Sequence, residues 1–497
     1  MKLPFMISSR VEDNRTISRT PGEAAPARTG ASRGKMLGRL FAPVDIASLV
    51  FFRIAFGAVM LWEVWRYFSH GWIGAYYMDP VFHFSYFGFG WVQPWPGNGM
   101  YLHFLALGVL AGCVMLGLFY RVAAVLFFLG FSYVFLLEQT LYLNHFYLIC
   151  LVSLLMIFVP AHRAFSLDAL RKPRIRSQTV PAWALWILAA QMAIAYFYGG
   201  LAKLNADWLQ GEPMRMWLAA STDFPVIGSL FTREWAPYLF SYGGLLFDLL
   251  IVPLLLWRKT RMFAFVAAVG FHVTNAELFQ IGIFPWLAIA ATTLFLPPSW
   301  PRRLASRLPF PRRSREYAET ATRTTRPESG AYSGMNNRQY AALALLGLFL
   351  AVQLLAPFRH HLYPGNSNWT EEGHRFAWHM KLRDVQAEAT FYATDPASGN
   401  VWELEPERYL TGWQASRMAP YPDMILQFSH HIADAYRQEG YEDIEVRAEV
   451  MASLNGREPQ PLVDPDEDLA RQSRTLAPSA WIVPLDKPLD ASGEGGR

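Results

Sequence analysis

Residues 182–208 read AWALWILAAQMAIAYFYGGLAKLNADW. The first part of this stretch is a long apolar run that ends at Lys203, and the residues after it form a polar segment that carries Trp208. A helix needs about 20 apolar residues to cross the hydrocarbon core of a bilayer. The stretch therefore predicts a membrane-spanning helix over residues 182–203 with an ammonium group at its end.

Long apolar blocks recur along the rest of the chain. Of its 497 residues, 53% are hydrophobic and only 17% are charged. Because membrane-spanning helices satisfy their backbone hydrogen bonds internally, the blocks predict a mainly α fold, a polytopic transmembrane helical bundle of about nine spans. The predicted spans cover residues 46–68, 101–118, 121–138, 142–160, 182–203, 237–257, 261–276, 283–297 and 339–356.

The distribution of Lys and Arg predicts how this bundle is oriented. Short loops rich in these residues remain on the cytoplasmic side of a membrane. They gather in loop 161–180, in the turn at 258–261 and in segment 298–338, whereas loop 69–100 contains none. We therefore expect the N-terminus inside and the chain after the ninth span outside.

The composition also divides the chain into segments. Residues 1–40 are rich in Arg, Ser, Pro and Gly without an apolar core, which predicts a disordered cytosolic N-terminus. We expect a transmembrane helical bundle over 41–300, a basic cytosolic linker over 301–338, a last transmembrane helix over 339–356, and an extracytoplasmic domain over 357–497.

The last of these segments has a different pattern from the rest. Residues 386–394 and 443–450 alternate polar with apolar side chains, as half-buried strands do, and residues 418–438 have helical spacing between them. The pattern predicts a small α+β domain with an antiparallel sheet packed on one helix.

The charge of the chain argues against nucleic-acid binding, and its cysteines argue against disulfides or a cysteine metal site. The formal net charge of +4 is accounted for by the basic loops, so we reject nucleic-acid binding. Cys113 and Cys150 both lie in predicted spans, where free cysteine usually behaves as a small hydrophobic residue. The sequence therefore indicates neither a disulfide framework nor a cysteine metal site.

Polar residues near the span ends gather at one depth. Three predicted spans bring such residues to their outer ends: Asn144 and His145 in the fourth, Lys203 in the fifth, and His272, Asn275 and Glu277 in the seventh. Ionisable residues in membrane segments are functional candidates by default. We therefore expect a site at the outer face of the bundle.

Lys203 is the candidate for chemistry at this face. An amine that loses hydration favours its neutral form and can act as a base near neutral pH. A lysine near a helix end can instead extend to the headgroups, and a single histidine such as His145 or His272 more often packs against a neighbouring helix. Three helices that deliver such groups together favour chemistry. A metal site of both histidines with Asp207 is the weaker alternative because no metal-ligand spacing is present.

Two further pairs have structural interpretations. The Gly199-Gly200 pair allows either close helix approach or room for a flat ligand ring, and the sequence leaves both open. Arg53 in the first span and Asp248 in the sixth lie at a similar depth from the cytoplasmic side. We expect them to pair across helices, because an unpaired charge at that depth is costly.

Several motifs occur in the order known from one family. They are Phe52–Gly57 (FRIAFG), Asn144–Leu148 (NHFYL), Gly200–Trp208 (GLAKLNADW), Phe271–Pro285 (FHVTNAELFQIGIFP), Asn368–Thr370 (NWT) and Ser479–Pro484 (SAWIVP). In these motifs the chain resembles the vitamin K-dependent γ-glutamyl carboxylases. The resemblance covers roughly residues 41–487, and its two longest motifs surround buried polar groups, which makes it more specific than a short pattern.

The resemblance implies a coupled reaction. In this family a reduced vitamin K hydroquinone is deprotonated and reacts with O2, the basic oxygen species formed removes a γ-proton from a peptide glutamate, and CO2 traps the carbanion. Oxidation of the quinol to its epoxide supplies the driving force, because a γ C–H beside a carboxylate is too weak an acid for a side chain to ionise. The implied cofactor is reduced vitamin K (menaquinol or phylloquinol), with O2 and CO2 as co-substrates and neither metal nor biotin.

The resemblance also assigns roles to residues. Lys203 matches the family's hydroquinone-deprotonating base. His145, beside Asn144, matches the Asn-His pair expected to stabilise the quinol oxyanion or later oxygen intermediates, and His272 matches a further histidine at the same face. The residues that we assign to cofactor binding are Gly199, Gly200, Asn275 and Trp208.

The sequence departs from that of the animal enzymes at several positions, and these departures bear on the type of organism and on the substrate. Their paired lysines are here Ala202-Lys203, their Leu-Asp-Ala-Asp-Trp is here Leu204–Trp208 (LNADW), and the cysteines of their lumenal disulfide have no counterpart. The first two departures change the local electrostatics. The missing cysteines favour a bacterial protein, in the inner membrane with the active site and the C-terminal domain facing the periplasm. We expect a Glu-containing secreted protein or peptide, the lipid bilayer and a quinone reductase for recycling as partners.

Two other functions remain open. One is quinol epoxidation without peptide carboxylation, because Lys203 and His145 bear only on the quinol. The other is a non-enzymatic membrane protein that binds quinone or lipid or anchors the outer domain. A neighbouring gene for a secreted protein with glutamate-rich segments would favour carboxylation.

Overall fold

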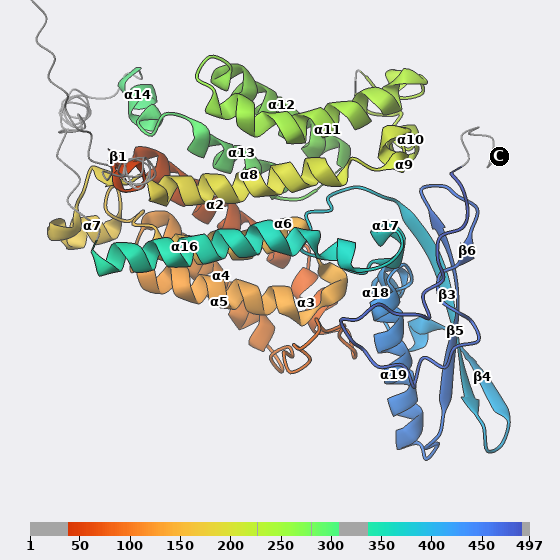
Figure 1. Ribbon diagram of the computed structural model, residues 1–497. Coiled ribbons are helices and arrows are strands. Elements are labelled where there is room, and N and C mark those ends of the chain that lie inside the picture. The colour runs from red at the N-terminus through yellow and green to blue at the C-terminus, as the bar shows by residue number, and fades with distance from the viewer. Residues whose placement is uncertain (1–37, 226, 280, 308–335, 490–497) are drawn as a thin grey trace, which may run out of the picture.

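The protein has two parts, a helical bundle and a domain of mixed α and β structure at one end of it (Figure 1). The computed structural model describes residues 38–225, 227–279, 281–307 and 336–489. We name the end of the bundle beside the C-terminal domain the domain end, and the opposite end the far end.

Seven helices in the described residues are long and apolar enough to cross a membrane. They are α2 (Ala47–Ser69), α4 (Gly99–Leu116), α5 (Tyr120–Leu137), α8 (Trp183–Ala202), α11 (Trp235–Leu256), α12 (Arg261–Phe279) and α16 with its 3-10 turn (Asn337–Leu362). Two shorter apolar helices are α6 (Asn144–Phe158) and α13 with its 3-10 turn (Phe284–Phe295). Each of the nine overlaps one predicted span, so the prediction of a polytopic bundle is confirmed.

Short elements connect these helices. They are β1 (Pro43–Asp45), α3 (Trp72–Tyr77), η1 (Gln139–Leu141), α7 (Leu167–Arg171), η2 (Pro173–Ile175), β2 (Thr179–Pro181), α9 (Ala206–Leu209), α10 (Met214–Ala219), η3 (Gly228–Leu230) and α14 (Trp300–Arg307). At the far end, β1 and β2 pair as a two-stranded antiparallel sheet, and Arg302 of α14 donates to both carboxylate oxygens of Asp45 at 3.0 Å. The predicted linker over 301–338 thus begins inside a helix, and its residues 308–335 lie outside the described residues. Of the N-terminus predicted to be disordered over 1–40, residues 1–37 lie outside the described residues and residues 38–40 are helical.

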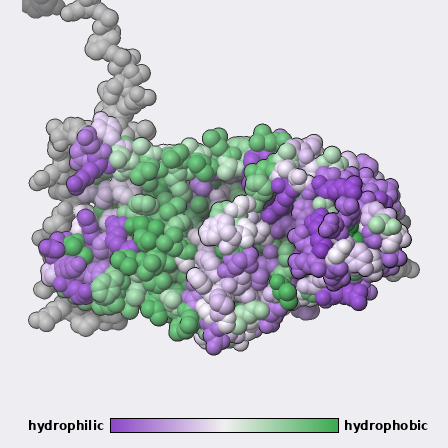
Figure 2. Space-filling view, turned by 90° about the horizontal axis from the view of Figure 1, so that it is seen from below, coloured by the Kyte–Doolittle hydropathy of each residue, from purple (hydrophilic) through white to green (hydrophobic). Residues whose placement is uncertain are grey.

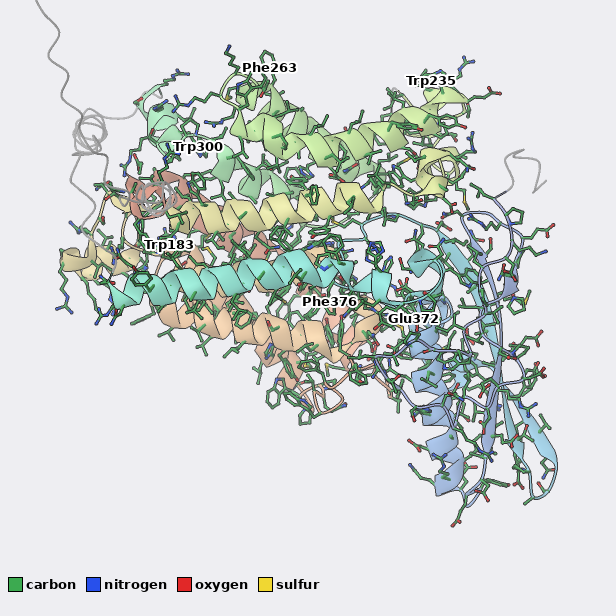
Figure 3. The ribbon with its side chains drawn as sticks, viewed as in Figure 1. Trp183, Trp235, Phe263, Trp300, Glu372 and Phe376 are labelled. Carbon is green, nitrogen blue, oxygen red and sulfur yellow. The ribbon has the colours of Figure 1, made fainter. Side chains whose placement is uncertain are left out.

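The surface of the bundle is that of a membrane protein. A broad hydrophobic area covers the helices, while the C-terminal domain is mainly hydrophilic (Figure 2). Trp183 and Trp300 lie at the far end and Trp235 lies at the domain end (Figure 3). Tryptophan at both ends of a helix bundle is typical of the two membrane interfaces.

Glycines set the closest helix contacts. A Cβ at Gly57 in α2 would lie 2.7 Å from the backbone nitrogen of Met115 in α4, and one at Gly200 in α8 would lie 3.0 Å from that of Leu249 in α11. Helix packing this close requires residues without a side chain at these points. For Gly200, the structure thus favours close helix approach over space for a ligand ring.

The C-terminal domain is built on a four-stranded antiparallel sheet. Its strands are β3 (Val385–Asp395), β4 (Asn400–Leu404), β5 (Glu445–Leu454) and β6 (Gln460–Pro461), in the order β4-β3-β5-β6. The central pair runs from Val385 opposite Leu454 to Thr394 opposite Glu445. Helix α19 (Pro422–Gln438) buries its apolar face against this sheet, and α17 (Ser367–Thr370), η6 (Pro406–Arg408) and α18 (Gly412–Met418) complete the domain. The predicted α+β architecture is confirmed.

Charged and polar side chains fix the domain to the bundle. Arg457, in the turn after β5, donates two hydrogen bonds of 2.7 Å to the carboxylate of Asp207 in α9. Gln414 of α18 donates to Glu138 at 3.0 Å, and both side chains are buried. The bundle and the domain therefore share a specific interface at the domain end.

The predicted ion pair between Arg53 and Asp248 is wrong. Arg53 does not reach Asp248; its guanidinium donates to the carbonyl oxygens of Ala161 and Phe165 at 3.1 and 2.6 Å. These carbonyls lie in the loop after α6 at the far end, where hydrogen bonds from backbone oxygens satisfy the buried cation. Asp248 has a different partner, Lys203.

Candidate active site

Lys203 lies directly after α8, and its side chain turns back into the bundle. The Nζ atom donates to the carbonyl oxygen of Gly199, one helical turn earlier, at 3.0 Å, and to Oδ2 of Asp248 in α11 at 2.6 Å. Lys203 and Asp248 are each only 6% exposed. The ammonium is therefore held inside the bundle and does not extend toward the headgroups.

The pair lines a cavity of about 480 Å³ at the domain end, which we name the lysine cavity. Residues of α8, α11 and α12 form most of its wall, and the segment after α17 closes it with Trp378, Met380 and Lys381. The wall is mainly apolar. Its polar side chains include Asn144, Asp248, Lys203, Asn275 and His272.

His272 belongs to a buried hydrogen-bonded chain. Its Nε2 atom lies 2.7 Å from the hydroxyl of Tyr196 in α8, and that hydroxyl lies 3.3 Å from Oγ1 of Thr292 in α13. The other ring nitrogen, Nδ1, is buried without a hydrogen-bond partner in the described residues. His272 is only 1% exposed, so an unused polar atom here is costly unless a ligand satisfies it.

Asn144 holds the segment after α17 that closes the lysine cavity. Its Nδ2 atom donates to the backbone oxygen of His379 at 2.8 Å, and its Oδ1 atom accepts from the hydroxyl of Tyr142 at 3.1 Å. The same Tyr142 hydroxyl accepts from the backbone nitrogen of Phe376 at 2.7 Å. The start of α6 thus holds the segment that closes the lysine cavity.

The structure places His145 in a neighbouring cavity. This cavity of about 560 Å³, which we name the histidine cavity, is lined by residues of α2, α3, α6 and the 378–381 segment. Asn144, Phe284, Met380 and Lys381 line both cavities. His145 is therefore separated from Lys203 by a shared wall, although the sequence placed the two at one depth.

The predicted cofactor-binding residues have different positions. Asn275 lines the lysine cavity, and so does Trp208, whose ring centre lies 5.3 Å from Nζ of Lys203 and whose Nε1 donates to the Ser241 oxygen at 2.8 Å. A Cβ on Gly199 would lie 2.6 Å from Cε of Met380. The absence of a side chain at Gly199 therefore leaves room for Met380 and the segment that closes the cavity. Gly200 faces α11 instead.

Three cations border the histidine cavity. Arg66, Lys381 and Arg417 line it, and the single carboxylate in its lining is Glu63, which pairs with Arg66 at 2.6 Å. Arg417 donates to the Thr140 oxygen at 3.1 Å. The lining therefore carries an excess of positive charge, which suits an anionic group.

Comparison with known proteins agrees with this arrangement. A family model described as the HTTM domain matches residues 41–300, more than half of the chain. A second model, described as the lumenal domain of vitamin K-dependent gamma-carboxylase, matches residues 338–488. The chain belongs to the vitamin K-dependent gamma-carboxylase family. No solved structure matches it.

The lumenal domain of this carboxylase-family chain supplies site residues that sequence reasoning missed. Its segment 371–381 crosses the domain end, and four residues in it, Glu371, Phe376, Trp378 and Lys381, have positive φ angles between 48° and 64°. Non-glycine residues rarely adopt this backbone without strong local constraints. No periodicity marks such a segment, so only the nearby Asn368–Thr370 motif pointed to it.

Metal ligation has no support in the described residues of this family member. No group of three or more His, Cys, Asp or Glu side chains there is arranged to hold a metal ion. Asp207, one predicted alternative ligand, is bound instead by Arg457 and Asn455. His145 and His272 line different cavities.

Proposed function

We propose that this protein is a vitamin K-dependent peptidyl-glutamate carboxylase that couples oxidation of reduced vitamin K or menaquinol to carboxylation of glutamate in a peptide. The observation that carries the proposal is the buried Lys203–Asp248 pair in the wall of an apolar cavity. Ligand sites commonly measure about 300–1,000 Å³, with mostly apolar walls and a few placed polar groups. The lysine cavity has these properties.

The lysine cavity suits the ring of a quinol. Its walls include the rings of Phe247 and Phe271, which stack at 3.7 Å, and the indole of Trp208. Lys203 and Asn275 in the wall offer polar groups for ring oxygens. Shape and polarity are therefore compatible with a flat aromatic ligand that carries two hydroxyl groups.

The cavity also suits a ligand with a long apolar tail. Among its lining residues, Leu239 and Gly243 of α11 and Ala267 and Thr274 of α12 are exposed on the outer surface of the bundle. The lysine cavity therefore opens sideways between these two helices, across the apolar surface. A prenyl tail can extend through this opening into the lipid while the ring stays beside Lys203.

Lys203 is the proposed base toward the quinol hydroxyl. When bound, the reduced quinone supplies the driving force, because its oxidation by O2 to the epoxide drives removal of a glutamate γ-proton, which CO2 then replaces. Nζ must first be neutral in order to accept a proton. Asp248 can take the ammonium proton across the 2.6 Å contact, and the neutral pair avoids the cost of keeping two charges away from water.

The histidine cavity is the proposed site of the peptide glutamate. Its excess of cations, Arg66, Lys381 and Arg417, can hold the γ-carboxylate. Lys381 lines both cavities, so a carboxylate bound to it lies at the border with the lysine cavity. His145 then faces the peptide side of the shared wall, where we propose that it moves or stabilises protons between the two reactions.

The distribution of charge supports a location for the site. The basic turn with Arg258 and Lys259 follows α11 at the far end, and the C-terminal domain lies at the domain end. Since basic loops remain in the cytoplasm, the site and the domain face the other compartment, which we propose is the periplasm of a bacterial cell. A secreted Glu-containing protein is then the substrate, and a quinone reductase regenerates the quinol.

The test is to measure quinone epoxide and labelled CO2 incorporated into a Glu-containing peptide, using purified wild type and Lys203→Met. Lys487→Met is the matched control, because this lysine is exposed and, among the described residues, pairs with Glu458 alone. Both products from wild type and from the control, and neither from Lys203→Met, are expected. Epoxide without incorporation would reduce the function to quinol epoxidation, and neither product from folded wild type would contradict the proposal.

A further inference from the structure

A third cavity lies between the C-terminal domain and the bundle, away from both cavities described above. It measures about 310 Å³, and we name it the arginine pocket. Its lining includes Tyr86, Arg359, Arg375, Tyr421, Asp423 and Arg474. None of its lining residues also lines the lysine cavity. The proposed carboxylation chemistry makes no use of it.

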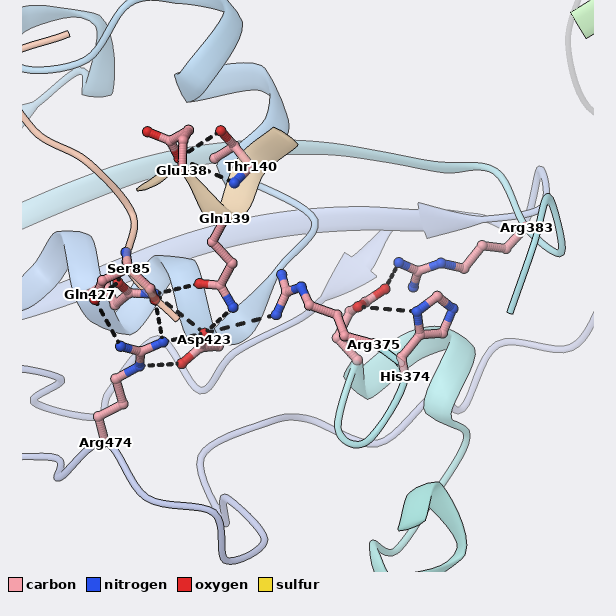
Figure 4. Close-up of polar contacts among 11 residues, drawn as sticks. Ser85, Glu138, Gln139, Thr140, His374, Arg375, Arg383, Asp423, Gln427 and Arg474 are labelled. Carbon is pink, nitrogen blue, oxygen red and sulfur yellow. Dashed lines mark hydrogen bonds and ion pairs between the residues drawn. The ribbon is translucent and has the colours of Figure 1, made fainter. Parts of the chain in front are cut away.

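Arg375 is a buried cation in this pocket without a close partner. It is only 8% exposed, and its Nε and Nη2 atoms have no hydrogen-bond partner in the described residues. The nearest carboxylate oxygen belongs to Asp423, 3.9 Å from Nη1. Asp423 is already held by Arg474, which donates to its two oxygens at 2.7 and 3.0 Å (Figure 4).

Arg359 is a second cation in the pocket. It lies 5.5 Å from the ring centre of Phe376 and donates only a long hydrogen bond of 3.4 Å to the Gly373 oxygen. It forms no ion pair with a described residue. Arg375 is buried and Arg359 is half-buried. Such charges are costly without an opposite charge nearby, and the cost is greater for the buried one.

The acidic residues of the pocket are engaged elsewhere. Glu371 pairs with Arg383 and lies 3.5 Å from His374. Glu372 accepts from the backbone nitrogen of Ser479 at 2.8 Å. Among the described residues, neither Glu371 nor Glu372 forms an ion pair with Arg375 or Arg359.

The pKa of the Tyr421 phenol depends on the positive charges around the pocket. Burial raises the pKa of Tyr421, but the positive charges of Arg383 and Arg375 outweigh burial, so that its pKa lies below the ordinary value. The Cζ atom of Arg375 lies 5.2 Å from the centre of the Tyr421 ring. The positive charges of Arg383 and Arg375 therefore act at the Tyr421 ring, which lines the pocket.

We propose that the arginine pocket binds a carboxylate-type oxyanion between Arg375 and Arg359. Guanidinium groups donate charge-assisted hydrogen bonds to carboxylate oxygens, so an anion held between the two arginines would compensate the charge of both. Two sources share this chemistry: free bicarbonate and the side chain of an acidic peptide. Phe376, beside Arg375, lines the pocket, and Trp378 lines the lysine cavity, so the same segment joins the two sites.

Calorimetric titration of the detergent-purified full-length protein tests the proposal without a measurement of activity. The probes are sodium bicarbonate, sodium acetate and a Glu-rich decapeptide, with its Gln-substituted counterpart as the uncharged control. Arg375→Gln and Arg359→Gln are each expected to weaken binding of the anions at least tenfold. Arg437→Gln is the matched control, because Arg437 is exposed and pairs only with Asp434, and it should bind as wild type does.

The outcomes separate the two sources of the anion. Binding of bicarbonate and acetate without the peptide identifies a free-anion site, and displacement of acetate by the Glu-rich peptide but not by the Gln peptide identifies an acidic side chain. The proposal is overturned if no probe binds wild type, or if binding is the same in wild type and both arginine variants. If Arg375→Gln does not fold, Arg359→Gln and the conservative Arg375→Lys, which retains charge but loses the paired donors, decide the result.

Discussion

The ammonium of Lys203 lies 2.6 Å from a carboxylate oxygen of Asp248, and the two residues belong to neighbouring segments, the end of α8 and the middle of α11. Both side chains are buried in the wall of the lysine cavity. A buried pair of this kind is stable only while both partners are present, since either one alone is an uncompensated charge.

Removal of one partner should therefore destabilise the bundle. Asp248→Asn is expected to lower the free energy of unfolding by about 3–5 kcal/mol, because it leaves the Lys203 ammonium buried without an anion. The double variant Lys203→Met/Asp248→Asn should be more stable than either single variant. Thermal unfolding of the detergent-purified proteins measures this, and additive losses in the double variant would show that the two groups do not interact.

The glycine of the carboxylase-like motif at the end of α8 should resist substitution. A Cβ at Gly200 would lie 2.8 Å from Cγ of Leu249 and 3.0 Å from its backbone nitrogen, so Gly200→Ala is expected to cost about 1–3 kcal/mol through overpacking. Gly270 in α12 has no heavy atom within 4 Å of its added Cβ and serves as the control. Equal melting temperatures for Gly200→Ala and Gly270→Ala would argue against this packing.

The opening between α11 and α12 predicts a dependence on tail length. Gly243 has open space where its Cβ would be, and it lines the lysine cavity at the outer surface. Gly243→Trp should raise KM for a long-tailed menaquinol while leaving KM for a tail-free quinol nearly unchanged. The same rise in KM for both quinols would place the obstruction at the ring and not at the tail.

Arg417, a cation of the histidine cavity, should affect only the peptide half-reaction. Arg417 lines this cavity and not the lysine cavity. Arg417→Gln is expected to raise KM for the Glu peptide about tenfold or more, through loss of a charge-assisted hydrogen bond, while quinol epoxidation continues. A parallel loss of epoxidation and carboxylation would remove the distinction between the two cavities.

His379 links the stability of the domain end to pH. Its pKa is lowered to about 3, first by burial and then by the nearby positive charges of His360, His361 and Lys203. An unfolded chain binds a proton at this histidine below about pH 6.5, whereas the folded chain does not until about pH 3. The stability contributed by neutral His379 is therefore present at neutral pH and is lost as the pH falls from about 6.5 toward 3.

This dependence can be checked by thermal unfolding between pH 7.5 and 5. His379→Gln should flatten the fall in melting temperature with acidification, and His70→Gln, at an exposed position, should not. A variant with the same pH profile as wild type would show that folding does not lower the pKa of His379.

The sequence predicted the bundle because a bilayer dictates helix length and polarity, and it predicted the C-terminal sheet because alternation of side chains follows from one buried face. It also placed Lys203, His272 and Asn275 at one end, where they share a cavity. Depth alone does not give the rotation of a helix. For this reason Asp248 was paired with Arg53, and the common depth of His145 and Lys203 did not reveal that they line different cavities. The direction in which each side chain points decides whether residues at one depth meet.

The segment 371–381 was beyond sequence reasoning for another reason. Its conformation depends on contacts with distant helices, such as the hydrogen bonds from Asn144 to His379 and from Phe376 to Tyr142. Positive φ angles at Trp378 and Lys381 have no signal in residue type, since glycine is absent from both positions. Tertiary contacts therefore determine the conformation of this segment, which closes the lysine cavity.

The central claim is that Lys203 takes a proton from a quinol in the lysine cavity. Anaerobic absorption spectroscopy of a reduced naphthoquinone titrated with the protein tests it before any oxygen chemistry begins. With wild type the bound quinol should show the spectrum of its anion near neutral pH, and with folded Lys203→Met it should bind with the spectrum of the neutral form. An anion spectrum of equal intensity in both proteins would contradict the account.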